Sequence, residues 1–293
     1  MSKVPNTNDG SNSKPYLRTD LNMGTLGSLP EWSTAPTGSD EEILKAVKAA
    51  GYQGTQGGNL ELCQKLGLGC TTGGRVNGVG EIDAMAETWA NDGYDAATLH
   101  VGWGMEEPEQ ILAIVTDIIE ASSKHNIGLY IETHRATITQ DMWRTVWLTR
   151  EIPDVRFNGD FSHWYTGLEM VYGGFEEKLE FIAPVLDRVR FLHGRIGNPG
   201  SIQVDIGDGS NRSYVDHFKA FWTKCFKGFL KDAQPGDYIS FNPELLESSI
   251  YYARNIPDAD GNPREEGDRW EQALIYTEIA KECFAVAELE MAK

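Results

Sequence analysis

The side chains of this chain that could do chemistry gather at the ends of short apolar segments. Four of the six histidines follow or end such segments, in the motifs TLH (98–100), IETH (131–134), GDFSH (159–163) and FLH (191–193). Acidic residues join them at the same positions, namely Glu132, Asp160 and, in the motif FNPE, Glu244. These three carboxylates, together with the imidazole of one such histidine, form a mixed oxygen and nitrogen set, which suits Mn²⁺, Mg²⁺, Co²⁺ or Zn²⁺. The pattern therefore predicts a site for one divalent cation.

The apolar segments themselves are predicted to be β-strands that alternate with helices. Eight candidate strands cover residues 16–23, 51–55, 68–72, 96–101, 128–132, 155–160, 189–193 and 238–244. Strand–helix alternation predicts a parallel sheet, and eight such units fit the roughly 250 residues of a closed (β/α)8 barrel. Side chains at the C-terminal ends of barrel strands converge on one mouth, so this fold would bring the motifs together. We predict a single α/β domain, a (β/α)8 TIM barrel, over residues 16–293.

Periodic apolar faces mark the helices between these strands. Residues 39–42 form a capping box that opens a helix, and residues 111–119 and 218–229 each place their apolar side chains on one face. A last helix is predicted from about residue 270 to residue 287. A doubly wound open sheet is the alternative architecture, but no GxGxxG motif follows the first strand.

The bulk properties of the chain restrict its partners. The 293 residues carry a formal net charge of −18, and so acidic a surface repels the phosphates of nucleic acids. The apolar runs are too short to cross a membrane. Four cysteines without CxxC spacing predict free thiols in a reducing compartment. Residues 1–15 are polar and lack the apolar stretch of a signal peptide, so we expect a disordered, mobile N-terminal tail and a cytoplasmic protein.

In their order on successive strands, the motifs resemble the xylose-isomerase-like superfamily of sugar isomerases and epimerases. The resemblance rests on Glu132 at the fifth strand, Asp-x-x-His at the sixth, His-x-Arg at the seventh and Glu244 at the eighth. It covers the chain from about residue 16. It implies a TIM barrel that binds a carbohydrate and holds one divalent cation, with Mn²⁺ as the first expectation, on Glu132, Asp160, His193 and Glu244. It also implies that His163 and Arg195 bind substrate oxygens.

The implied reaction removes a proton from the carbon next to a carbonyl, through a metal-stabilised enediolate. Glu132 and Glu244 are the candidate base and acid on either side of the metal. His100, Trp103 and Trp164 lie at or just past the ends of the fourth and sixth strands. These three side chains are therefore candidates for contacts with the sugar.

The stretch after the fifth strand departs from the ketose epimerases, which tend to carry another acidic residue there. Here His134 and Arg135 take its place. His134 is therefore an alternative base, and one that favours elimination over return of the proton. A second function stays open for this reason: a lyase that eliminates the aglycone from a 3-keto-glycoside, O- or C-linked. Such lyases can work with a small non-barrel partner subunit, and related barrels often form homo-oligomers.

Two further functions are weighed against these. A non-catalytic sugar-binding barrel would bind its ligand without turnover and without a metal. An apurinic endonuclease-like phosphodiesterase would need an Asp-x-His motif after the seventh strand, where this chain has Asp205-Ile-Gly207. The missing histidine and the negative charge argue against that second function.

Overall fold

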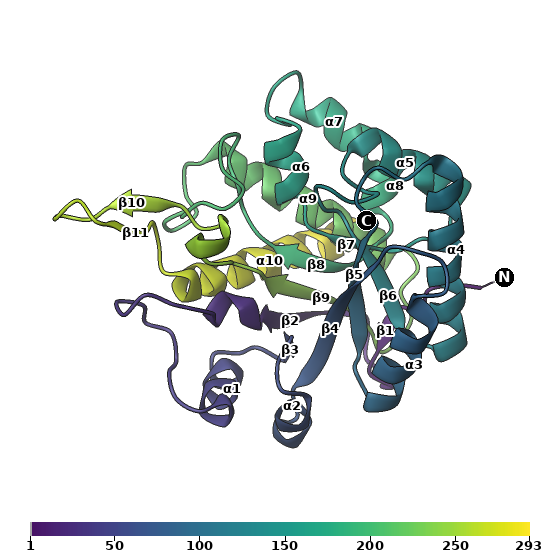
Figure 1. Ribbon diagram of the computed structural model, residues 1–293, viewed down its shortest axis with the longest axis horizontal. Helices are drawn as coiled ribbons and strands as arrows, with labels where there is room; N and C mark the ends of the chain where they lie inside the picture. Colours follow the sequence, from purple (N-terminus) through teal and green to yellow (C-terminus); the bar gives the residue numbers. More distant parts are fainter. Residues whose placement is uncertain (1) are drawn as a thin grey trace.

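Eight parallel strands close into a barrel at the centre of the molecule (Figure 1). The structure, a computed structural model, describes residues 2–293. Each strand pairs with the next from β2 to β9, and β9 pairs in turn with β2. The barrel strands are β2 (Tyr16–Asn22), β3 (Gly54–Gln56), β4 (Gly69–Val76), β5 (Ala96–Val101), β6 (Gly128–Glu132), β7 (Phe157–Gly159), β8 (Val189–Gly194) and β9 (Asp237–Pro243). The predicted (β/α)8 barrel is confirmed.

Helices surround the barrel and follow its strands in the chain (Figure 1). They are α1 (Asp40–Ala49), α2 (Leu60–Leu66), α3 (Ile82–Asp92), α4 (Pro108–His125), α5 (Met142–Glu151), α6 (Ser162–Gly167), α7 (Phe175–Phe181), α8 (Ala183–Leu186), α9 (Ser213–Leu230) and α10 (Arg269–Met291), with short 3-10 turns η1 (Met23–Leu26) and η2 (Ser248–Ile250). The Ser39 hydroxyl and the Glu42 carboxylate cap α1 reciprocally, as the sequence predicts. Within residues 2–293, no helix has both the length and the apolar character that crossing a membrane requires.

The apolar faces predicted from periodicity are buried against the barrel. On α4 these include Ile111, Ile114 and Ile118, and on α9 they include Phe218 and Trp222. All four cysteines are buried and free. The strands and the surrounding helices therefore pack against each other through a hydrophobic layer.

The interior of the barrel, in contrast, is polar. Near the start of the strands, Arg18 on β2 donates to Asp20, to Asp95 and to the Tyr238 hydroxyl, each at 2.7 Å. Inward glycines leave room for this cluster, since a Cβ at Gly54 would lie 2.6 Å from an oxygen of Asp20. Polar side chains thus extend down the barrel from the mouth, where barrels more often carry branched aliphatic layers.

Residues 2–15 are built into the fold, which corrects the mobile tail that the sequence predicts over residues 1–15; Met1 lies outside the described residues. Strand β1 (Thr7–Asn8) pairs antiparallel with β9, and Val4 is buried. Asn6 donates to Asp237 at 2.8 Å and accepts from Arg190 at 2.9 Å. The segment is polar because it satisfies buried polar groups of the barrel, and composition alone cannot distinguish that from disorder.

A long connection follows the last barrel strand. It contains η2 and a hairpin of β10 (Asn255–Pro257) and β11 (Pro263–Glu265), which projects from the body of the molecule (Figure 1). Arg269, at the start of α10, is buried and ties this connection to η1 through hydrogen bonds to the carbonyls of Thr25 and Gly27. The connection therefore borders the barrel mouth from one side.

We predict that deleting residues 2–9 destabilises the protein by about 3 kcal/mol, because several hydrogen bonds worth roughly 1 kcal/mol each are lost and buried partners are left unpaired. Urea denaturation followed by far-ultraviolet circular dichroism measures the change. Deleting the exposed residues 291–293 is the control and leaves the midpoint unchanged. An unchanged midpoint in the N-terminal deletion would show that the segment contributes nothing to stability.

Candidate metal centre

Four side chains from four consecutive strands meet at the C-terminal mouth of the barrel. Each offers one ligand atom, and these atoms all lie within 4.8 Å of one another. Glu132 ends β6, Asp160 follows β7, His193 lies near the end of β8, and Glu244 follows β9. We call Glu132, Asp160, His193 and Glu244 the carboxylate–histidine cluster. The geometry that the sequence required of these four residues is therefore present.

The imidazole of the cluster is held in one orientation by Gln56 on β3. The Nε2–H of His193 donates to Oε1 of Gln56 at 2.7 Å, which assigns the hydrogen to Nε2. Nδ1 then faces the carboxylates, 3.4 Å from Glu132 and 3.3 Å from Glu244. Gln56 is itself fixed, because it donates to Thr98 at 2.9 Å and accepts from Asn22 at 3.0 Å. Histidine ligands of metals are commonly oriented in this way.

The carboxylates are also held by neutral hydrogen-bond donors. Asn158 on β7 donates to Glu132 at 3.1 Å, and Asn22 on β2 donates to Glu244 at 2.9 Å. The Ser162 backbone N–H donates to Asp160 at 3.1 Å. These donors fix the direction of each carboxylate but add no positive charge.

Arg195 supplies positive charge to the carboxylate–histidine cluster. Its guanidinium bridges two members of the cluster, Asp160 at 2.7 Å and the carboxylate of Glu244. With His193 neutral, as an imidazole that ligates a metal must be, three carboxylates against one guanidinium leave a formal charge of −2, which one divalent cation balances. Oxygen-rich donors with one imidazole suit Mn²⁺ or Mg²⁺ as well as Zn²⁺. The residues present therefore fit the expected metal.

The pKa values show how strongly the buried charges interact. Burial raises the pKa of Asp160 to about 6, although Arg195 opposes this shift. Burial alone would lower the pKa of His193, but Glu244 and Glu132 outweigh it and raise that pKa to about 9. Burial would raise the pKa of Glu132, yet His193 and His100 hold it well below its usual range. The cluster thus favours any positive charge placed among its carboxylates.

Three histidine rings lie in a row beside the cluster. The ring centroids of His100 and His134 are 4.2 Å apart, and those of His134 and His163 are 3.8 Å apart. His134 donates from Nδ1 to the Arg135 carbonyl at 2.5 Å, which leaves the lone pair on Nε2. Burial lowers the pKa of His134 to about 4, so the ring is neutral at pH 7. We call these three residues the histidine stack.

The loop that carries His134 is fixed by threonines and by Trp164. The Thr139 hydroxyl donates to the Glu132 carbonyl and accepts from the His134 backbone N–H. The indole N–H of Trp164 donates to the Thr139 carbonyl at 2.8 Å, and the Trp164 side chain has no exposed surface. The expectation that Trp164 contacts the sugar is therefore wrong. Instead, Trp164 holds the loop that carries His134 in place through its hydrogen bond to Thr139.

The other expected substrate contacts divide between exposed and covered residues. Trp103 is 53% exposed and stacks on Arg75, whose Cζ lies 4.0 Å from the ring centroid. His100 is partly exposed and lies 3.4 Å from Glu132. Arg195 and His163 are buried beneath Tyr252, with Arg195 Cζ 4.5 Å from its ring. Arg195 donates to the carboxylates of Asp160 and Glu244, and the His163 ring lies against the ring of His134.

Several residues of the site escape the sequence motifs. Asn22, Gln56 and Asn158 hold the cluster, and Tyr252 covers Arg195. Each of the first three is an amide near the end of a barrel strand, so strand-end position was the only signal available for them. Tyr252 lies in the long connection after β9, where no periodicity fixes its direction.

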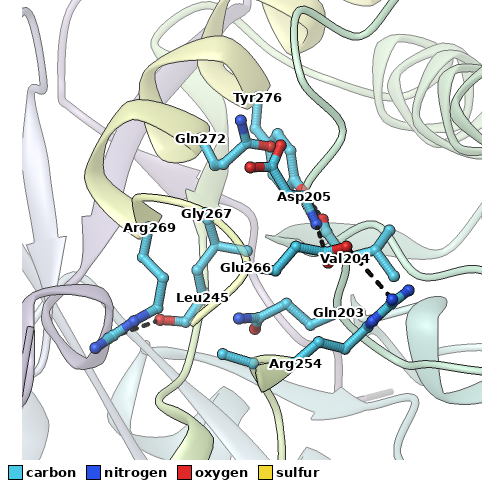
Figure 2. Close-up of a pocket in the computed structure, with 11 residues that line it drawn as sticks. Gln203, Val204, Asp205, Leu245, Arg254, Glu266, Gly267, Arg269, Gln272 and Tyr276 are labelled. Carbon is cyan, nitrogen blue, oxygen red and sulfur yellow. Dashed lines mark hydrogen bonds and ion pairs between the residues drawn. The ribbon is translucent and has the colours of Figure 1, made fainter. Parts of the chain in front are cut away.

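A separate small cavity lies between this connection and α10, and Figure 2 shows the side chains that line it. Its volume is about 20 Å³, room for a single water molecule. Asp205, the residue weighed for an endonuclease motif, lines this cavity together with Glu266 and Gln272, and no member of the carboxylate–histidine cluster does. The structure thus gives Asp205 no place among the candidate ligands.

We predict that Gln56→Leu lowers the affinity for Mn²⁺ by about 10- to 100-fold, because His193 loses the acceptor that orients it. Competition with a fluorescent metal-binding dye measures the affinity. Gln64→Leu makes the same change on the exposed surface of α2 and keeps the wild-type affinity. Equal affinities for the two variants would mean that Gln56 does not support a metal ligand.

Comparison with known proteins gives a likeness of fold. No protein-family model matches the chain, and no curated protein matches it. Among solved structures, a xylose isomerase-like TIM barrel protein from Mycobacterium smegmatis in complex with magnesium aligns over 92% of this chain and 97% of its own, with a TM-score of 0.55 and 12% identity. The probable 3-DHS dehydratase AsbF from Bacillus anthracis covers 62% of this chain and 74% of its own, with a TM-score of 0.46 and 16% identity. The likeness to the first of these structures confirms the TIM-barrel fold of this chain.

Proposed function

We propose that this protein is a divalent-metal-dependent isomerase or epimerase of sugars. The observation that carries the proposal is the convergence of three carboxylates and one imidazole, with one guanidinium, at the barrel mouth. Active sites of this fold lie at that face. A divalent cation bound there would polarise a carbonyl and so acidify the neighbouring C–H bond.

The side chains of the cluster then have distinct tasks. Arg195 holds Asp160, and Gln56 holds His193. We assign to Glu132 and Glu244 the removal and return of the substrate proton at their carboxylate oxygens, because they lie on either side of His193 Nδ1. A positioned acid or base contributes about 10²- to 10⁴-fold to a rate.

A second candidate function rests on His134. Its Nε2 lone pair, its neutral state and its place beside Glu132 make it a base independent of the carboxylates. A base that does not return its proton favours elimination, as in the release of an aglycone from a 3-keto-glycoside. Trp103, exposed at the mouth over Arg75, is a candidate platform for the sugar in either reaction.

We predict that chelator-treated protein loses activity and that Mn²⁺ or Mg²⁺ restores it, because the cation that would polarise the substrate carbonyl is then absent. Assays of ketose stereoisomer interconversion before and after dialysis measure this. Full activity in metal-free protein would refute the proposed function. Ligand binding without turnover or bound metal would favour a sugar-binding barrel.

Replacement of His134 by asparagine separates the two candidate functions. If Glu132 and Glu244 move the proton, His134→Asn lowers the interconversion of free ketoses only a few-fold, and solvent deuterium enters the product next to the carbonyl. If His134 is the base, the variant loses aglycone release from 3-keto-glycosides by about 10²-fold or more. Chromatography of both product classes, with mass spectrometry for deuterium, distinguishes these outcomes.

A further inference from the structure

A cavity of about 280 Å³ opens beside the candidate metal centre. Its walls come from the segments that follow four consecutive barrel strands: Arg135 after β6, Thr166 on α6 after β7, Ser201 after β8, and Tyr252 with Arg254 after β9. We call it the arginine pocket. Loops after the seventh and eighth strands of such barrels are frequent places for anion binding, because they lie at the mouth and present backbone and side-chain donors.

The charge of this pocket is opposite to that of the protein. The chain has 44 acidic residues and a net charge of −18, yet no Asp or Glu is among the described residues that line the pocket. Two arginines and several hydroxyl groups do line it. The pocket is therefore a positive recess in a negative surface, and such a recess attracts anions locally.

The two arginines of the pocket are not equivalent. Arg254 lies 3.4 Å from Glu266, which neutralises much of its charge. Arg135 is exposed and forms no ion pair in the part of the chain that the structure describes, and its Cζ lies 5.2 Å from the ring centroid of Tyr252. Arg135 therefore keeps its donors available for a ligand. A guanidinium binds carboxylate and phosphate groups through two parallel hydrogen bonds.

The arginine pocket adjoins the metal centre through two residues. Tyr252 contacts Arg135 on the pocket side and covers Arg195, which bridges Asp160 and Glu244. His134, the residue before Arg135, stands in the histidine stack. A group bound by Arg135 would therefore lie beside Tyr252 and His134, the side chains that border the carboxylate–histidine cluster.

From this geometry we propose that the arginine pocket binds an anionic group of the substrate, and that Arg135 is its ion-pairing residue. The substrate class of the proposed enzyme is then a keto-sugar that carries a carboxylate or a phosphate, rather than a neutral ketose. This inference rests on the proposed function, because only an enzyme has a substrate. The binding of an anion beside Arg135, in contrast, does not depend on turnover.

The test is calorimetric titration of the metal-loaded protein at low ionic strength with three probes: inorganic phosphate, D-glucuronate and neutral D-glucose. We expect at least one anion to bind more tightly than glucose, and added NaCl to weaken that binding. Arg135→Gln should lower the affinity for the anion about tenfold or more. Tighter binding of phosphate or of glucuronate tells which anionic group the pocket takes.

Arg264→Gln is the matched control. Arg264 is also exposed and also lies over an aromatic ring, with Cζ 4.5 Å from the centroid of Trp32, but it stands on β11 outside the pocket. The control removes the same charge and should bind the anion as the wild type does. The proposal is overturned if Arg135→Gln still binds the anion, which is the result expected of an anion held by the metal alone. It is also overturned if the wild type binds no anion.

The outcomes also separate this inference from the proposed function. Metal-restored turnover of neutral ketoses without anion binding would refute the pocket and leave the isomerase standing. Anion binding that depends on Arg135, in a protein without metal-dependent turnover, would do the reverse. For an acidic substrate that is turned over, Arg135→Gln should raise KM much more than it lowers kcat, because the residue binds a group remote from the reacting carbon.

Discussion

Three carboxylates buried together at the mouth of the barrel repel one another, and their repulsion has to be balanced by positive charge. Arg195 supplies part of this balance by bridging Asp160 and Glu244. The negative charge that remains raises the pKa of His193, and burial together with the neighbouring carboxylates raises the pKa of Asp160. A divalent cation is the natural counterpart of such a set, since it brings two charges and tolerates mixed oxygen and nitrogen ligands.

This arrangement depends on exact orientation as well as on charge. Three amide side chains, Asn22 and Gln56 on two further strands and Asn158 on β7, direct the carboxylates and the imidazole without adding charge. They come from β2, β3 and β7, so nearly the whole circumference of the barrel contributes to one site. A closed parallel barrel makes this possible, because all its strands end at the same face.

Around this rigid centre, the loops add the groups that distinguish one reaction from another. The histidine stack and the arginine pocket both come from segments after the strands, and Tyr252 joins them to the cluster. The cluster is compatible with proton transfer on many carbonyl compounds. His134 and Arg135 are the neighbours that would decide between isomerisation and elimination, and between acidic and neutral substrates.

Much of the fold could be predicted from the sequence, including where several of the barrel strands end. The strands at 96–101 and 128–132 have the bounds expected from the sequence. Strand β4 runs on to Val76, beyond the expected residue 72, because it continues through Gly73 and Gly74, which carry no side-chain pattern. The N-terminal segment was misjudged for a related reason, since polar residues that pair with a buried strand look like a disordered tail.

What the amino-acid sequence determined by itself was the order of elements and the strand ends at which acidic and histidine side chains gather, because both follow from local periodicity. The choice of His193 among four such histidines came from the resemblance to the xylose-isomerase-like barrels. Only the tertiary structure decided which side chains face the mouth. It buried Trp164 beneath a loop, placed Arg195 between two carboxylates, and set Arg135 in a pocket free of acidic residues. The physical reason is that side-chain direction in the loops depends on contacts between residues far apart in the chain, which no local pattern encodes.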